Sequence, residues 1–335
     1  MKVKKEYAAL AIVIVALGLY LFLRSTDRTT YTLPELPALD TQAISKIEIS
    51  RGDKTIDLER QGDTWRVAPG DYPADASLVN RMLDDLADLK VTALVSETRN
   101  YARYELGEDK QIRVTAFQDG KAVRAFQIGK PADTFRHTHI TLAEDPNVYH
   151  AQGNFRNDFD QSVADLRDKT VMAFKPEDVT EFTVASNGRE FTLHKVKTAP
   201  SPAEKKDDSA ADEEKPSDSE PTWQTADGTS VDNEKVEQLL ADVAGLKCRA
   251  YLNDQSKSDL SSPAYSIRIQ AGSTSVLEVF ETEDDTASEL PARSSLREEP
   301  FTLADFDIDA LKNFIADLRG DNEKETAKED KTASP

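Results

Sequence analysis

Histidines provide the clearest opportunity for chemistry in this chain of 335 residues. His137 and His139 stand two positions apart on a predicted strand, so their side chains lie on the same face. Such a pair can bind Zn²⁺ or Cu²⁺ where a third ligand converges, and His150 on the next predicted strand is a candidate for that ligand. Two residues at this spacing are a weak pattern, and an exposed polar strand face accounts for them more simply. We therefore predict no metal-binding, cofactor-binding or catalytic residues.

The other reactive side chains form no recognisable site, and His194 is isolated in the sequence. Asp305, Asp307 and Asp309 alternate as in the first part of a calcium-binding loop, but the glycine and the closing glutamate of such a loop are missing. We expect these aspartates to begin the last helix. The single cysteine, Cys248, excludes an intrachain disulfide, and we expect it to be a small buried side chain. The sequence contains no phosphate-binding glycine loop, no serine nucleophile elbow and no zinc-protease motif, and we predict a non-enzymatic protein.

Short strands must position the histidines. Apolar residues at period two predict a series of strands that begins near Ile44, and Asp119–Gly120 is a typical hairpin turn between two of them. We expect two further strands at 135–142 and 147–151, with a turn at Asp145–Asn147 between them.

A helix interrupts the first group of strands. Asp75 is its expected N-cap, and apolar side chains recur at helical spacing as far as Leu89. The same spacing predicts that Asp84, Asp85 and Asp88 lie on the outer face of this helix.

The pattern of the first half recurs in the second half. Phe182 repeats the position of Ile47, Trp223 takes the place of Trp65, and Ile267 is aligned with Ile112. The sequence Ala-Asp-Leu-Arg at 164–167 also returns at 316–319. We therefore predict an α+β fold with two tandem copies of an antiparallel-sheet-plus-helix unit, preceded by an N-terminal transmembrane helix. The predicted parts are a signal anchor at 1–24, a tether at 25–43, the first repeat at 44–175, the second repeat at 176–319 with a disordered insertion at 198–221, and a disordered tail at 320–335.

The predicted anchor is the uncharged apolar run at residues 7–23. As a helix it is about 26 Å long, which just spans a bilayer core. The run ends in bulky residues and Arg24 rather than an A-x-A-like site, which favours an uncleaved anchor over a cleaved signal peptide. Lys2, Lys4 and Lys5 precede the run and favour a cytoplasmic N-terminus, with the rest of the chain outside. The polar, proline-bearing tether is expected to lift the folded part off the membrane.

The charge of the chain restricts its partners. The formal net charge is −20. Such a surface repels nucleic acid and anionic lipid headgroups, so neither is expected to bind the folded part. Part of the acidity lies in the insertion at 198–221, whose composition is too polar to bury a core.

A set of short motifs in the first repeat resembles a known family. Together with the anchor and the tryptophan-containing strand, the set is similar to the "domain of unknown function 4340" family of bacterial membrane-anchored envelope proteins, over roughly residues 44–320. The second repeat lacks the first two motifs, so a function tied to them would belong to the first repeat. The motifs are Tyr104–Gly107 (YELG), Ile128–Lys130 (IGK), Val148–Tyr149 (VY) and Leu166–Lys169 (LRDK).

The resemblance implies a single-pass protein of the bacterial cytoplasmic membrane with an extracytoplasmic domain. It also implies an accessory role beside gliding-type ABC transport components, with an envelope or transporter protein as the partner. Two alternatives remain open from the sequence. One is an envelope module that binds a small ligand or glycan in a cleft between the repeats, and the other is a metal-dependent hydrolase around His137, His139 and His150.

Overall fold

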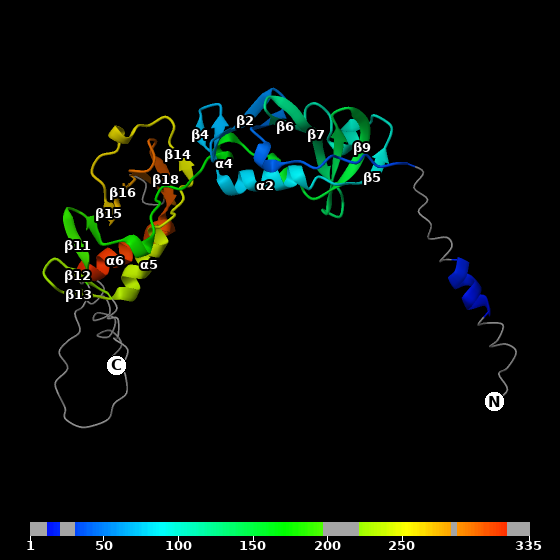
Figure 1. The fold of residues 1–335 in the computed structure, drawn as a ribbon. Helices are drawn as coiled ribbons and strands as arrows, with labels where there is room; N and C mark the ends of the chain where they lie inside the picture. Colours follow the sequence, from blue (N-terminus) through cyan, green and yellow to red (C-terminus); the bar gives the residue numbers. More distant parts are fainter. Residues whose placement is uncertain (1–11, 21–30, 197–220, 283–286, 320–335) are drawn as a thin grey trace, which may run out of the picture. The chain divides into compact units, whose positions relative to one another are not determined.

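The computed structural model describes residues 12–20, 31–196, 221–282 and 287–319 (Figure 1). Contacts divide the chain into two compact units, of which the first ends at Arg167 and the second begins at Asp168. The sequence places this boundary later, between 175 and 176. The predicted tail at 320–335 and all of the predicted insertion except Pro221 lie outside the described residues.

Only part of the predicted anchor and tether is described. Residues 12–20 are helical, and the remainder of the run at 7–23 lies outside the described residues. None of the helices within the described residues has both the length and the apolar character that a bilayer crossing requires.

The first unit is built on one antiparallel sheet of nine strands. The strand order is β4-β3-β2-β1-β6-β7-β8-β9-β5, so β6 lies in the middle of the sheet with β1 next to it. The helix between β4 and β5 connects the two edge strands. The strands are β1 (Lys46–Arg51), β2 (Lys54–Gln61), β3 (Thr64–Ala68), β4 (Tyr72–Pro73), β5 (Val91–Ser96), β6 (Ile112–Gln118), β7 (Lys121–Pro131), β8 (His137–Leu142) and β9 (Asp145–Gln152).

Helices cover one face of this sheet. Helix α2 (Ala76–Ala87) buries Leu78, Val79, Met82, Leu83 and Leu86 in a core shared with the strands. The expected N-cap is confirmed, because Asp75 Oδ1 accepts hydrogen bonds from the Ser77 and Leu78 N–H groups. The remaining helical segments are η1 (Thr41–Ala43), η2 (Tyr101–Tyr104), α3 (Arg156–Phe159) and α4 (Val163–Leu166).

The second unit repeats the architecture of the first. Its nine strands have the order β13-β12-β11-β10-β15-β16-β17-β18-β14, which is the order of the first sheet with every number raised by nine. The strands are β10 (Glu181–Ser186), β11 (Arg189–Val196), β12 (Thr222–Thr225), β13 (Ser230–Val231), β14 (Ala250–Tyr251), β15 (Tyr265–Ala271), β16 (Ser273–Val279), β17 (Glu289–Ser294) and β18 (Phe301–Ala304). The helical segments are η3 (Pro176–Asp178), α5 (Asn233–Val243), η4 (Lys257–Asp259), η5 (Asp305–Ile308) and α6 (Asp309–Arg319).

Strand registers match between the two sheets. The pair Ile47–Leu58 of the first sheet is equivalent to Phe182–Leu193 of the second. In the same way, Ile49–Val114 is equivalent to Val184–Ile267. Ile267 therefore corresponds to Val114, and its alignment with Ile112 is wrong by two residues. A shift of two keeps the same face of a strand, so the hydrophobic pattern alone could not distinguish the two registers.

The two tryptophans occupy equivalent, buried positions. Trp65 pairs with Arg60, whose guanidinium carbon lies 4.9 Å from the centroid of the indole ring. Trp223 pairs with Lys195, whose ammonium nitrogen lies 5.8 Å from its ring centroid. Each tryptophan thus packs its inner face on a core and is covered by a cation from the neighbouring strand.

One local prediction needs correction. The turn between β8 and β9 lies at Ala143–Glu144, and Asp145 already pairs with Leu142 as the first residue of β9. Asp145 stabilises that strand, because its carboxylate accepts hydrogen bonds from the Asn147 N–H and the Tyr149 hydroxyl. The shared Ala-Asp-Leu-Arg sequence also differs in context, since it ends the long helix α6 but forms only the single turn α4, which Ser162 starts with a capping box.

The described part of the predicted tether belongs to the first unit. Leu33, Leu36 and Leu39 pack against its core, and the buried Arg124 donates a hydrogen bond to the Pro37 carbonyl at 2.6 Å. From Leu33 onward this segment therefore covers the sheet.

The equivalent N-caps provide a test of the two units. Asp75→Ala should lower the free energy of unfolding of the first unit by about 1–2 kcal/mol, because two N–H groups lose their acceptor. Asp232→Ala should cost the second unit about 1 kcal/mol, because Asp232 Oδ1 accepts only from the Glu234 N–H. Urea unfolding followed by fluorescence separates the units, since a Trp223→Phe background reports on Trp65 alone and a Trp65→Phe background on Trp223. Equal losses in both units from either substitution would contradict this assignment.

Candidate functional site on the outer face of the first sheet

Two histidines face each other across β8 and β9. His139 and His150 are direct cross-strand partners, and their Nε2 atoms lie 3.1 Å apart. His139 Nδ1 lies 2.9 Å from the Lys130 carbonyl oxygen and must donate its proton there. His139 Nε2 is therefore the acceptor in the histidine pair, and His150 Nε2 is the donor.

The third histidine joins this pair. The ring of His137 stacks on that of His150, with the centroids 5.7 Å apart and an angle of 30° between the planes. The predictions that His137 and His139 share a face and that His150 approaches them are confirmed. The expectation of an exposed polar face is wrong for His139, which is only 7% exposed.

The histidines lie on the face of the sheet that points away from the main core. Ile140 and Tyr149 alternate with them along the strands and point into that core. Burial is the main cause that lowers the pKa of His139. Burial also lowers the pKa of His150, and the neighbouring His139 and His137 lower it further. Uncharged imidazoles are consequently the stable form at neutral pH.

The YELG segment covers the histidines. The ring of Tyr104 lies 5.0 Å from that of His139, and Leu106 is buried beside it. The segment crosses β7 at Gly129, where an added Cβ would lie 2.3 Å from the Tyr104 carbonyl oxygen and 2.9 Å from Leu106 Cγ. The YELG and IGK motifs thus meet at one contact, which only glycine permits.

Arg156 forms hydrogen bonds next to the contact between Gly129 and the YELG segment. Its Nε donates to the Gly129 carbonyl at 2.8 Å, and its Nη2 donates to the Lys110 carbonyl at 2.6 Å. Its Nη1 forms an ion pair with Asp160 at 3.3 Å. A single guanidinium on α3 therefore links β7 to the residues that follow the YELG segment.

The second unit has no such cluster on the same scaffold. Val279 of β16 is equivalent to Ile128 of β7. The next residue, Phe280, therefore stands where the first unit has Gly129. The strand registers, followed from β1 in the first sheet and from β10 in the second, also align the histidine positions with residues of the second unit. The residues at the places of His137, His139 and His150 are Glu289, Pro291 and Thr302.

The other sequence candidates lie elsewhere. His194 is in the second unit and contacts Glu181 at 3.1 Å. Cys248 is buried as expected, and burial raises the pKa of its thiol. The aspartates of 305–309 begin the last helix, as expected, with Lys312 and Arg249 as cationic partners. Within the described residues, no group of three or more His, Cys, Asp or Glu side chains is arranged to hold a metal ion.

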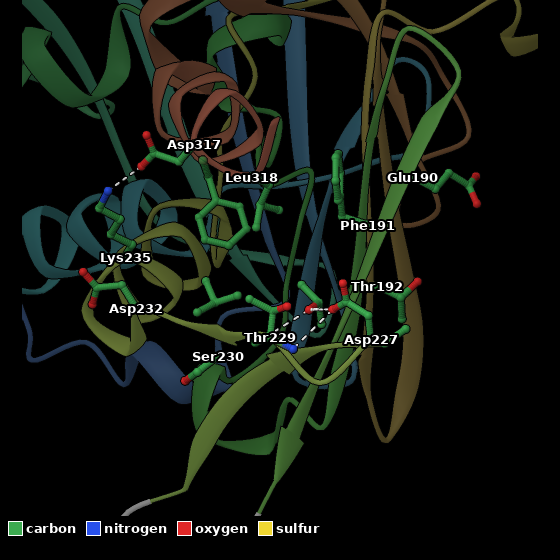
Figure 2. A pocket seen from close by; sticks show the side chains of 14 residues that line it. Glu190, Phe191, Thr192, Asp227, Thr229, Ser230, Asp232, Lys235, Asp317 and Leu318 are labelled. Carbon is green, nitrogen blue, oxygen red and sulfur yellow. Dashed lines mark hydrogen bonds and ion pairs between the residues drawn. The ribbon is translucent and has the colours of Figure 1, made fainter. Parts of the chain in front are cut away.

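Each unit also has a surface groove. In the second unit a groove of about 630 Å³ has an apolar floor that includes Phe191, Phe314 and Leu318, and the Lys235–Asp317 ion pair lies beside it (Figure 2). In the first unit a groove of about 930 Å³ lies between the β1–β2 turn and the helical turns at 159–165. Grooves lined by both apolar and charged side chains can accept a segment of another molecule.

Sequence reasoning missed a pair of carboxyl groups between α2 and α3. Asp85 is half-buried rather than on the outer face of the helix, and its Oδ2 atom is buried without a hydrogen-bond partner. Burial, followed by the charges of Asp158 and Asp84, raises its pKa to about 7, against a smaller opposing effect of Arg81. Arg81 instead holds Asp158, with Nε 2.9 Å from its Oδ1. The spacing of Arg81 and Asp85 was visible in the sequence, but the approach of Asp158 from α3 was not.

Comparison with known proteins identifies one family. The model of a family described as "Domain of unknown function (DUF4340)" matches residues 65–263, which is more than half of the chain. This range includes the YELG, IGK and VY motifs that meet or adjoin the histidine cluster. No curated protein and no solved structure matches the chain.

The contact at Gly129 can be tested by adding one methyl group. Gly129→Ala should lower the free energy of unfolding of the first unit by about 1–3 kcal/mol, because the Tyr104 carbonyl must move away from the new Cβ. Gly107→Ala is the matched control, since its Cβ would meet only the flexible Asp109 side chain at 3.0 Å. Urea unfolding in the Trp223→Phe background measures both. Similar losses for the two variants would contradict a special close approach at Gly129.

Asp85 should make the stability of the first unit depend on pH. Its pKa is higher in the folded than in the unfolded state, so stability is fully present below pH 4 and is lost as the pH rises towards 7. Because the side chain is half-buried, we expect a loss of about 1–3 kcal/mol. Asp85→Asn should remove this loss and be more stable than wild type at pH 8. Asp84→Asn removes one of the two neighbouring charges that raise this pKa, so it should reduce the loss only in part. A wild-type advantage over Asp85→Asn at pH 8 would refute the assignment.

Proposed function

The chain belongs to the DUF4340 family, and from this premise we propose that it is a single-pass, membrane-anchored accessory protein that presents its two units outside the cytoplasm to an envelope protein partner. The observation that carries the proposal is the helix at residues 12–20. Its seven large apolar side chains are 53–69% exposed, although they would be costly to leave in water. A lipid environment would bury them.

The sequence around this helix supports an anchor. The uncharged run extends over residues 7–23, long enough to cross a bilayer core. Lysines concentrated before the run support a cytoplasmic N-terminus and an extracytoplasmic location for the folded units. With these flanks the anchor belongs to the cytoplasmic membrane of a bacterium, as the family resemblance implies.

Exposed aromatic residues support a protein partner. Phe135 is 72% exposed at the β7–β8 turn, where its φ of +56° holds it in a conformation unusual for a residue with a side chain. Phe306 in the second unit is 68% exposed, with the Arg249 guanidinium carbon 5.0 Å from its ring centroid. Aromatic and arginine side chains of this kind are common anchors of protein interfaces. An ABC-type membrane subunit is the partner that the family resemblance implies.

The anchor predicts how the protein fractionates. Full-length protein should remain in carbonate-washed membranes and be released only by detergent, whereas a variant that lacks residues 1–24 should be soluble and folded. A variant that lacks residues 321–335 is the matched control and should stay in the membrane. Lys121→Cys in a Cys248→Ala background should react with an impermeant maleimide from outside the cytoplasmic membrane, whereas Lys4→Cys should not. A soluble full-length protein, or the reverse labelling pattern, would refute the proposed placement.

The partner is tested separately in intact membranes. Crosslinking, affinity capture and mass spectrometry should recover an ABC-type membrane subunit with the full-length protein. Phe135→Ser should weaken that capture, while Leu296→Ser, which removes another exposed apolar side chain, provides a control. Recovery of this chain alone would refute the accessory role and leave the anchor intact.

A further inference from the structure

We propose that His139 and His150 are ligands of a divalent transition-metal ion on the outer face of the first sheet. Two nitrogen ligands of one Zn²⁺ ion, each about 2.0–2.1 Å from the metal, lie about 3.3 Å apart in tetrahedral geometry. The two Nε2 atoms are already 3.1 Å apart. An ion placed between them would therefore need only small movements of the two rings.

His139 is held as a metal-ligating histidine usually is. Its Nδ1–H donates to the Lys130 carbonyl at 2.9 Å, so the lone pair of Nε2 points towards His150. A hydrogen bond from the far ring nitrogen to a carbonyl fixes both the orientation and the tautomer of a ligating imidazole. Tyr104 packs against the ring and limits its rotation further.

His150 changes tautomer when the ion binds. Without metal its Nε2–H donates to His139 Nε2, and this proton occupies the position that the ion requires. Because His150 is only half-buried, solvent can carry the proton from Nε2 to Nδ1 of the same ring. Because the proton stays on the same ring, the transfer needs no proton acceptor other than solvent.

His137 provides the third ligand after a side-chain rotation. Its ring lies 5.7 Å from that of His150, so it is near the ion position without already being arranged there. Water completes the coordination. Imidazole ligands favour Zn²⁺, Cu²⁺ and Ni²⁺ over the hard ions Mg²⁺ and Ca²⁺.

The second unit shows that the fold itself does not require these histidines. Its sheet has the same strand order but carries Pro291 and Thr302 at the places of His139 and His150. The Thr302 hydroxyl donates to Glu289 at 2.6 Å, so the cross-strand position there makes an ordinary polar contact. The histidine cluster is thus an addition to the scaffold in one unit.

Zinc titration of the full-length protein in detergent micelles tests the proposal. Isothermal titration calorimetry should show one strong site per chain, above the weak binding of a chain with 62 acidic residues. His150→Gln should weaken the strong site by about tenfold or more, and His137→Gln by less. His139→Asn keeps a donor for the Lys130 carbonyl while it removes Nε2, and should weaken binding as strongly as His150→Gln. His194→Gln, which alters the only other histidine, should leave the isotherm unchanged.

A second measurement identifies the ligands directly. The electron paramagnetic resonance spectrum of bound Cu²⁺ should show hyperfine coupling to imidazole nitrogens, and this coupling should disappear in the His139→Asn/His150→Gln double variant. Circular dichroism confirms that the variants are folded. An isotherm of the double variant that overlays that of wild type, or a Cu²⁺ spectrum with oxygen ligands only, overturns the proposal.

Discussion

The contact between a main-chain carbonyl and a glycine determines what the first sheet can carry on its outer face. The Tyr104–Gly107 segment lies against β7 only because residue 129 has no side chain. Its position buries Leu106 and places Tyr104 beside His139, and Arg156 of α3 lies 4.0 Å from the Glu105 carboxylate of the segment. The low exposure of His139, and with it the neutral form of the ring, follows from this one close approach.

Duplication explains how one unit can carry such a feature without loss of the fold. Both sheets have the same strand order, equivalent central pairs and a tryptophan covered by a cation. These shared contacts lie on the core side, which specifies register and supplies most of the apolar burial. The opposite face is less constrained, so it holds Gly129 and histidines in one unit and Phe280 and Pro291 in the other.

The features that could be predicted from the sequence are those that depend on residues close together along the chain or on a repeated pattern. Hairpin turns, the Asp75 cap and the repeat follow local rules, and the structure contains them. The burial of His139 and the environment of Asp85 depend on segments distant in sequence, so hydrophobic spacing could not predict them. Gly129 was the available signal, because an isolated glycine within a strand pattern indicates a close backbone approach. The sequence located the motifs, but only the folded chain shows that YELG and IGK touch.

The packed segment before β1 has a consequence for the proposed anchored protein. Since Leu33 already contacts the core of the first unit, only residues 24–32 separate that core from the apolar run. Nine extended residues reach at most about 32 Å, so in such an anchored protein the first unit would stay close to the membrane surface. The segment at 31–36 lies beside residues 89–92 at the start of β5, and Thr92 donates to the His150 carbonyl at 3.1 Å. In the proposed anchored protein, the edge of the sheet next to the histidines would therefore be the edge nearest the anchor, within reach of a membrane partner without a long linker.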